Sequence, residues 1–429
     1  MPDKSLQKRI LLSLPLLTLF ITPWLIKEAS ASLVVPYLYS FVEAGTWTTP
    51  RGDTLDLTES RLYLKPLDDL INPILAVFAP SMSGYDEVGR LQMLSFLMDV
   101  GPFFVILMFE KSRQRFSWTA LLYPFAFALT AQLTGAGKLA GLFFFIEYLW
   151  APVSSFPTAE STAIPKSAVI ALPVAMLLVY YPLTLGSYVA PTLGDRARVN
   201  AYWQLYPFMV VGLHWGLVVV VGRARGGIET TTTTTTAQAT EPELKSKPTN
   251  TKPQQQQQQQ PNPRPELPTL TAAITLLSTL SAITFQYIRF SLPQSTTLLN
   301  IFTPSTLLPL PLTSNSNSNP SPMNIDPFAL HVRNMLQYDE LFWVAAGYCW
   351  LLLSFHDLRQ RQQRGGVSNR ASTPTPTPTP APALTPALTP APALWVVLLG
   401  LVLGTVVVGP GATFGGAWVV REWLWIGGF

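Results

Sequence analysis

Residues 91–109 read LQMLSFLMDVGPFFVILMF, an apolar stretch that contains a single charged residue, Asp99. A helix needs about 20 apolar residues to cross the hydrocarbon core of a bilayer, so this stretch is long enough to span one. Eight further stretches have the same character, although several are slightly shorter. The nine predicted spans cover residues 10–26, 91–109, 118–134, 139–153, 167–185, 205–222, 269–290, 341–355 and 395–408.

The composition of the whole chain supports this interpretation. Of its 429 residues, 48% are hydrophobic and only 12% are charged, whereas soluble domains carry about 25% charged residues. We therefore predict an all-α fold, a polytopic integral membrane bundle of about eight or nine transmembrane helices with the lipid bilayer as its partner. Proline recurs within the spans and kinks helices, so we expect bent helices around a cavity. These prolines are Pro102, Pro124, Pro173 and Pro207.

Charge and cysteine content argue against several classes of function. The formal net charge is +4, and the basic residues fall in loops rather than in a patch with interleaved aromatic residues, which disfavours nucleic acid as a partner. The single cysteine, Cys349, cannot form an internal disulfide or a thiolate cluster. Three histidines lie far apart, without the spacing of a helix-borne metal site. The sequence therefore predicts neither a metal nor a cofactor.

Two polar tracts interrupt the apolar stretches. Residues 223–267 contain runs of threonine and glutamine, and residues 356–394 repeat Thr-Pro and Ala-Pro pairs. Such compositions cannot bury enough apolar surface to fold, so we predict disordered cytosolic linkers. The predicted organisation is an N-terminal anchor helix (1–33), a helical membrane core (34–222), a first linker (223–267), C-terminal membrane helices (268–355), a second linker (356–394), and a last membrane helix with a tail (395–429).

Basic residues predict the orientation of the spans. Clusters of Lys and Arg precede the first span and follow the second, sixth and eighth. With the N-terminus in the cytosol, all four clusters lie on the cytosolic side, as the positive-inside rule requires. Arg196 and Arg198 are the exception, because they fall on the lumenal side. The first span also resembles a cleavable signal peptide, with a basic start and small residues after it, and both alternatives give the same orientation.

Two carboxylates stand inside predicted spans. Asp99 lies in FLMDVGPFF and Glu147 lies in LFFFIEYLWAP. A carboxylate at the centre of a span costs about 2.5–3.5 kcal/mol or more, so each calls for an explanation. Apolar surroundings favour the protonated form of a carboxyl group, which can then deliver a proton. A hydrogen bond between helices is the alternative explanation.

Aromatic residues surround Glu147 in the sequence. If some of them face a cavity, their rings can stabilise a carbocation by about 2 kcal/mol or more each. A buried acid with aromatic walls is what the proton-initiated cyclisation of a polyene needs, because the walls also keep water from quenching the cation. The residues in question are Phe143, Phe144, Phe145, Tyr148 and Trp150.

Two other acidic sites flank the spans. Glu43 precedes the half-length apolar stretch at residues 70–82, which we expect to be re-entrant or interfacial. The pair Asp68 and Asp69 invites a magnesium–diphosphate interpretation, but the spacing of that motif is incomplete. In LQYDELFW, Asp339 and Glu340 stand at the predicted start of the eighth span, where helix capping would also explain them.

The order of these segments resembles the fungal membrane-bound terpene cyclases of meroterpenoid pathways, of the ascofuranone, ascochlorin and macrophorin type. The resemblance rests on VPYLYSFVEAGTW at residues 35–47, LYLKPLDDLINPILAVFAPSM at 62–82, FLMDVGPFF at 96–104, the aromatic helices that follow, and LQYDELFW at 336–343. It covers most of residues 34–222 and a patch at 336–355. The two low-complexity tracts and the last span depart from the pattern.

The resemblance implies an enzyme of the endoplasmic reticulum membrane that acts on a hydrophobic prenylated molecule. Such enzymes protonate a terminal epoxide or alkene of a farnesylated aromatic compound and cyclise it without releasing diphosphate. We expect Glu147 or Asp99 to supply the proton, with Glu43 and Asp339 as further candidate catalytic residues. A transporter of small solutes or lipids is the main alternative, because it would also use kinked helices and buried carboxylates. A non-enzymatic scaffold would leave both buried acids unexplained.

Overall fold

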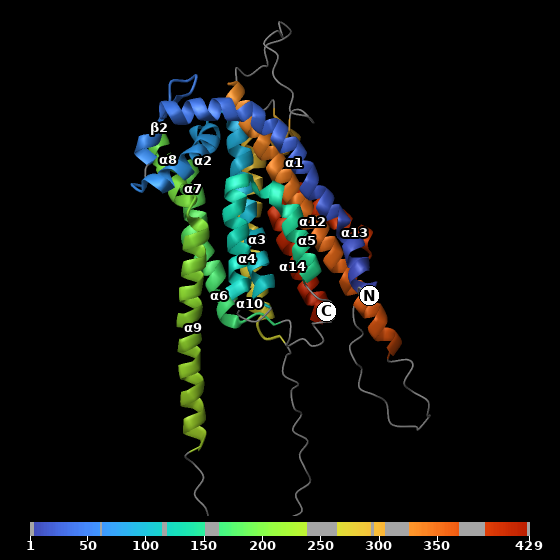
Figure 1. Ribbon diagram of the computed structural model, residues 1–429. Coiled ribbons are helices and arrows are strands. Elements are labelled where there is room, and N and C mark those ends of the chain that lie inside the picture. The colour runs from blue at the N-terminus through green and yellow to red at the C-terminus, as the bar shows by residue number, and fades with distance from the viewer. Residues whose placement is uncertain are drawn as a thin grey trace, which may run out of the picture.

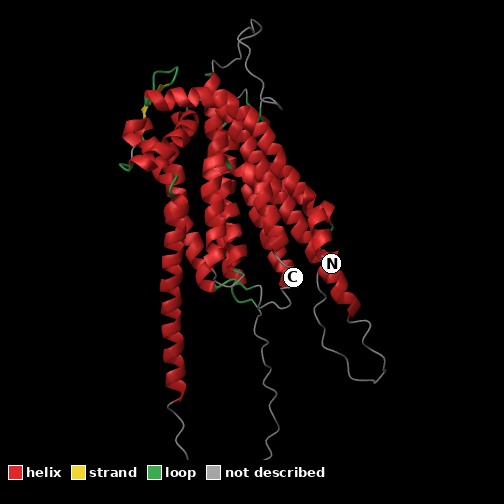
Figure 2. Cartoon of the chain, viewed as in Figure 1, coloured by secondary structure: helices red, strands yellow, loops and turns green. Residues whose placement is uncertain are grey.

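The computed structural model describes residues 4–60, 62–113, 118–150, 163–237, 264–292, 296–304, 326–368 and 391–426. Almost all of these residues are helical, as Figure 2 shows, which agrees with the predicted all-α class. The elements are α1 (Lys4–Ala44), β1 (Thr46–Thr48), β2 (Thr54–Asp56), η1 (Leu57–Ser60), α2 (Lys65–Ser83), α3 (Glu87–Ser112), α4 (Trp118–Thr134), α5 (Ala136–Trp150), α6 (Lys166–Ala175), η3 (Met176–Tyr180), α7 (Tyr181–Val189), α8 (Leu193–Trp203), α9 (Tyr206–Ala237), α10 (Leu267–Ser291), α11 (Leu298–Phe302), α12 (Pro327–Ser368), α13 (Leu394–Val408) and α14 (Pro410–Ile426).

The long helices run side by side between two ends of the molecule (Figure 1). At one end, which we call the hairpin end, α2, α8 and the antiparallel pair β1–β2 form a small cap. Both chain termini lie toward the opposite end. We call it the ion-pair end, because a cluster of buried ion pairs that includes Glu110, Arg113 and Glu422 lies there. The C-terminal part of α1 lies across the hairpin end, while its N-terminal part runs along α5 and α12.

Helix α3 forms the centre of the bundle. Its apolar stretch is buried on all sides, and it packs against α10, α14 and α4. A helix that is hydrophobic all round has no face suited to water, so it is stable only when neighbours or lipid surround it. The stretch quoted first, residues 91–109, is therefore the core around which the other helices assemble.

Six helices are long and apolar enough to cross a membrane. Three other predicted spans also form helices, but α4, α5 and α13 contain only 17, 15 and 15 residues. The number of spans thus stays a prediction. The six segments are Leu6–Ile26, Glu87–Ser112, Lys166–Val189, Tyr206–Arg223, Leu267–Ser291 and Pro327–Gln363.

Several predicted boundaries differ from the observed helices. The first linker was expected to begin at residue 223 and the second at 356, yet α9 continues to Ala237 and α12 to Ser368. The boundary at residue 33 also falls inside α1, which contains three prolines and is continuous to Ala44. Charged or polar residues do not end a helix by themselves, because a helix can extend beyond its apolar part into water. Most of the two low-complexity tracts, residues 238–263 and 369–390, lies outside the described residues.

The C-terminal tail is the largest difference from the prediction. Residues 410–426 form α14, which turns back at Gly409 and packs against α10 and α3. Gly409 has a φ of 89°, a conformation that glycine adopts readily. The buried rings of Phe414 and Trp418 join the core. The charged pair Arg421 and Glu422 makes this stretch look like a tail in the sequence.

Candidate functional site

A cavity of about 280 Å³ lies at the hairpin end of the bundle. Residues of α1, α2, α3, α4, the start of α5, α12 and the α8–α9 junction line it. Most of the lining side chains are aliphatic or aromatic, as in binding sites for hydrophobic small molecules, which usually measure about 300–1,000 Å³. In this part of the structure the helices thus surround a cavity, as the prolines of the sequence predicted.

Aromatic side chains form part of the cavity wall. Phe78 of α2 and Trp203 of α8 contact each other with ring centroids 5.8 Å apart. Trp203 also packs on Tyr206, at 5.0 Å, and its indole N–H donates a hydrogen bond of 2.9 Å to Thr184. Because both the ring and the N–H have partners, this wall is held in a fixed orientation. Phe78 belongs to the half-length apolar stretch at residues 70–82, whereas no sequence signal pointed to Trp203 as part of a cavity.

Among the residues that the structure describes, Asp339 is the only one with a carboxylate side chain that lines this cavity. It lies within α12, on the same helical stripe as Met335 and Leu336, which also line the cavity. Its two oxygens accept hydrogen bonds from the backbone N–H groups of Ala136, at 2.8 Å, and Gly137, at 3.0 Å. These are the first N–H groups of α5, which have no partner within their own helix.

The contact between Asp339 and α5 explains the local sequence. Gly135 has a φ of 97°, which lets the chain reverse between α4 and α5. A Cβ atom on Gly137 would lie 2.3 Å from the backbone oxygen of Asp339, so only glycine permits this approach. The sequence suggested that Asp339 caps its own helix. Instead, α12 begins at Pro327, and Asp339 caps the neighbouring helix α5 while facing the cavity.

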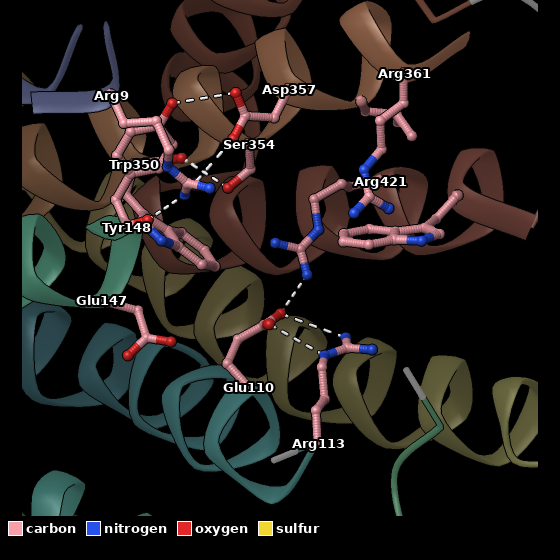
Figure 3. A pocket seen from close by; sticks show the side chains of 12 residues that line it. Arg9, Glu110, Arg113, Glu147, Tyr148, Trp350, Ser354, Asp357, Arg361 and Arg421 are labelled. Carbon is pink, nitrogen blue, oxygen red and sulfur yellow. Dashed lines mark hydrogen bonds and ion pairs between the residues drawn. The ribbon is translucent and has the colours of Figure 1, made fainter. Parts of the chain in front are cut away.

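Glu147 lies elsewhere, toward the ion-pair end. Its carboxylate forms an ion pair with Lys111 of α3, and the side chains are only 3% and 4% exposed. Of the aromatic residues near it in the sequence, Phe143, Phe144 and Tyr148 are buried, whereas Trp150 is 63% exposed. Phe144 contacts Trp350, with ring centroids 5.6 Å apart. Glu147 borders a polar chamber of about 50 Å³, not the apolar cavity (Figure 3).

Asp99 also faces away from the cavity. Its neighbours Leu97 and Val100 line the cavity, but Asp99 accepts hydrogen bonds from the hydroxyl group of Ser281 on α10 and from the backbone of Gly411 on α14. It lies 12 residues before Lys111, about 18 Å along α3 at 1.5 Å per residue. The structure therefore does not bring together Asp99 and Glu147, the two residues expected from the sequence to supply the proton.

The remaining predicted residues occupy the hairpin end. Glu43 is exposed near the end of α1 and does not line the cavity. The pair considered for diphosphate diverges: Asp68 accepts a hydrogen bond from the N–H of Leu62, whereas Asp69 pairs with Lys65 on the surface. Glu340 does not line the cavity, and it accepts a hydrogen bond of 2.8 Å from Gln92 of α3.

A cluster of buried ion pairs at the opposite end was not predicted. Glu110 lies between Arg113 and Arg421 (Figure 3), and Arg113 also binds Glu422 at 2.7 Å. Arg264, which precedes α10, binds Glu422 at 3.0 Å. This cluster joins α3, α10 and α14. In the sequence these residues resemble the charged residues of a solvated linker and tail. Nothing in the local sequence indicates that they form ion pairs with one another.

Comparison with known proteins adds a family to this geometry. The model of the CtvD domain family matches residues 38–426. The chain is 26% identical over 205 residues to FAD-dependent monooxygenase verC1 of Penicillium polonicum, covering 48% of this chain and 25% of that protein. It is 21% identical over 268 residues to FAD-dependent monooxygenase anuJ of Penicillium roqueforti, covering 62% and 27%.

A third relative carries the name of a cyclase. Terpene cyclase ctvD of Aspergillus terreus is 26% identical over 171 residues, which make up 38% of this chain and 48% of that protein. The chain thus spans between a quarter and a half of the length of these three relatives. No solved structure is significantly similar to it. Since the family match extends over nearly the whole of the described part, the chain belongs to the CtvD domain family.

Proposed function

We propose that the chain is a membrane-bound terpene cyclase of fungal secondary metabolism. It protonates the terminal epoxide or alkene of a farnesylated aromatic precursor and closes its rings without releasing diphosphate. The observation that carries this proposal is the apolar cavity with aromatic rings on one wall and the carboxyl group of Asp339 on another. The relative named terpene cyclase supports the reaction type. Six long apolar helices support a membrane location, for which we propose the endoplasmic reticulum.

Asp339 has the position to supply the proton. Its protonated carboxyl group transfers a proton to the epoxide oxygen, or to the terminal alkene carbon. In the epoxide case the C–O bond breaks as the electron pair of a neighbouring alkene forms the first ring bond. The last carbocation loses a proton to the carboxylate, so the product is an isomer of the substrate and the acid is restored. Between these steps, the N–H groups of Ala136 and Gly137 stabilise the carboxylate.

The walls serve the cationic intermediates. The rings of Trp203 and Phe78 line the cavity, and an aromatic ring that turns its face to a cation attracts it by cation–π interaction, worth about 2 kcal/mol or more in a desolvated site. The aliphatic walls exclude water, which would otherwise add to the cation and stop ring closure. These contributions act on the transition states more than on the neutral substrate, as catalysis requires.

The two monooxygenase relatives favour an oxidised substrate. Each matches this chain over about a quarter of its own length, so a region similar to this chain is only one part of those proteins. Flavin monooxygenases place oxygen from O₂ on organic substrates, and an epoxide is one such product. We therefore expect the epoxide to react more readily than the alkene, since opening its strained ring needs less assistance.

The test compares acids on and off the cavity. Microsomes that carry the wild type, Asp339→Asn, Asp99→Asn or Glu147→Gln receive a farnesylphenol or its terminal epoxide. The products are identified as isomers of equal mass by chromatography and mass spectrometry, and conversion is divided by the amount of folded protein. General acid catalysis contributes about 10²–10⁴-fold, so we expect Asp339→Asn to lose at least two orders of magnitude while the other variants stay active.

Each other outcome has a defined meaning. If Asp339→Asn keeps its activity and Glu147→Gln or Asp99→Asn loses it, the cavity is not the site of protonation, and the acid is one of the two originally expected from the sequence. If the folded wild type converts neither substrate, the cyclase proposal fails. In that case transport of a small solute or lipid becomes the better hypothesis.

A further inference from the structure

Two amide side chains on the cavity wall have unused hydrogen-bonding groups. Gln204 lies at the α8–α9 junction and is only 4% exposed. Its Nε2 donates a hydrogen bond of 3.0 Å to Oδ1 of Asn200, while its Oε1 has no partner in the described part of the chain. Asn200 takes one of the two N–H groups of the amide, and the oxygen is the acceptor left for a ligand.

Gln132 presents the complementary group. It lies on α4, two residues before the end of that helix and four residues before Ala136 of α5, whose N–H binds Asp339. Its Nε2 is buried, and within the described residues it has no hydrogen-bond acceptor. Thr134, a third polar residue of the wall, differs because its hydroxyl group donates to the carbonyl of Thr130 at 2.9 Å. The two glutamines therefore stand apart from the other lining residues.

Such unpaired groups are uncommon in native proteins. A buried donor or acceptor without a partner costs about 1–3 kcal/mol. Where no group of the protein binds such a donor or acceptor, an ordered water or a ligand usually does. Gln204 offers an acceptor and Gln132 offers a donor, and both line the cavity that also contains Asp339. A group that both donates and accepts hydrogen bonds would satisfy the two amides at once.

We propose that Gln204 and Gln132 recognise the hydroxylated aromatic head group of the prenylated substrate. The hydroxyl of a phenol or enol donates to Oε1 of Gln204, and an oxygen of the same head group accepts from Nε2 of Gln132. The apolar remainder of the cavity then takes the prenyl chain. This inference rests on the proposed function, because it assigns the part of the substrate that does not react.

The head group also explains selectivity. A site built to bind a hydroxyl group rejects analogues that lack it, because its own polar groups are then buried without partners. A methyl ether of the same compound keeps the acceptor oxygen but loses the donor. It should therefore lose the bond to Gln204 and keep the bond to Gln132.

Equilibrium binding tests this without any reaction. The full chain in lipid nanodiscs receives a radiolabelled farnesylphenol or its methyl ether, at a pH at which the phenol is neutral. We expect the wild type to bind the phenol about 10- to 100-fold more tightly. Gln204→Met, which keeps the length of the side chain, should bind both compounds equally. Gln132→Met should weaken both by about tenfold. Thr130→Val is the control, since Thr130 lies on the exposed face of the same helix.

Other results would overturn the inference. Equal binding of phenol and ether by the wild type contradicts it, even if the variants fail to fold. An unchanged preference in folded Gln204→Met contradicts it as well. The proposed function can fail separately: if the wild type prefers the phenol but converts neither compound, head-group recognition stands and cyclisation does not.

Discussion

At the scale of single residues, what a carboxyl group faces matters more than how deeply it is buried. Asp99, Glu147 and Asp339 are all buried, yet only Asp339 lines the apolar cavity. Glu147 is neutralised by Lys111, and Asp99 is held by Ser281 and Gly411. The sequence draws attention to the first two because they interrupt apolar runs. The partners of Glu147 and Asp99 cannot be predicted from the spacing of residues in the sequence, because they lie on other helices.

The ion pair of Glu147 predicts a stability effect rather than a catalytic one. Glu147→Gln leaves the ammonium group of Lys111, itself 4% exposed, without its counter-ion. Removing one partner of a buried pair costs about 3–5 kcal/mol. We therefore expect a lower midpoint of thermal unfolding in detergent for Glu147→Gln. The double variant Lys111→Met, Glu147→Gln should recover most of the loss. A midpoint equal to that of the wild type would show that the pair contributes nothing.

At the scale of elements, helix type was predictable and helix extent was not. Apolar runs such as residues 91–109 predict α3 because a polar backbone in an apolar environment must bond within its own segment. The same rule does not reveal α14, because its apolar face is interrupted by Arg421 and Glu422. These charges are neutralised by Glu110, Arg113 and Arg264, and such long-range pairing leaves no periodic signal. Equally, Gln132 and Gln204 have no motif, and only the fold gives them a shared cavity.

Two glycines of α14 provide a matched test of its packing. A Cβ on Gly411 would lie 2.5 Å from a carboxylate oxygen of Asp99 and 2.7 Å from its Cα, whereas a Cβ on Gly416 meets nothing within 4 Å. Gly411→Ala should therefore destabilise the protein by about 1–3 kcal/mol. Gly416→Ala should be neutral or stabilise it by up to about 1 kcal/mol, because alanine is the better helix former. Thermal unfolding of both variants compares them, and equal midpoints would mean that α14 does not pack on α3.

At the scale of the whole molecule, basic side chains lie at both ends of the bundle, in different surroundings. Arg9, Arg113, Arg361 and Arg421 all border the chamber at the ion-pair end, so basic clusters from distant segments meet there. Arg196, an exception to the positive-inside pattern, lies at the hairpin end and donates to the carbonyl oxygens of Ala190 and Met82. Its guanidinium group is thus hydrogen-bonded within the cap. The predicted linker that ended at residue 267 must be shortened, because Arg264 and Glu266 are buried and belong to the ion cluster.

The return of α14 predicts the side on which the C-terminus lies. Nine spans with a cytosolic N-terminus would place the C-terminus in the lumen, but α14 adds a further pass toward the ion-pair end (Figure 1). The positive-inside rule assigns this end to the cytosol. An N-glycosylation acceptor appended after Phe429 should therefore remain unmodified, as should one inserted at Gln255. Helix α12 begins at the hairpin end, where the N–H of Asp326 binds Tyr85, so an acceptor inserted within residues 305–325, before α12 in the sequence, should be glycosylated and serves as the positive control. Modification after Phe429 alongside an unmodified Gln255 site would mean that α14 does not cross the membrane, and a fully inverted pattern would reverse the orientation of the whole bundle.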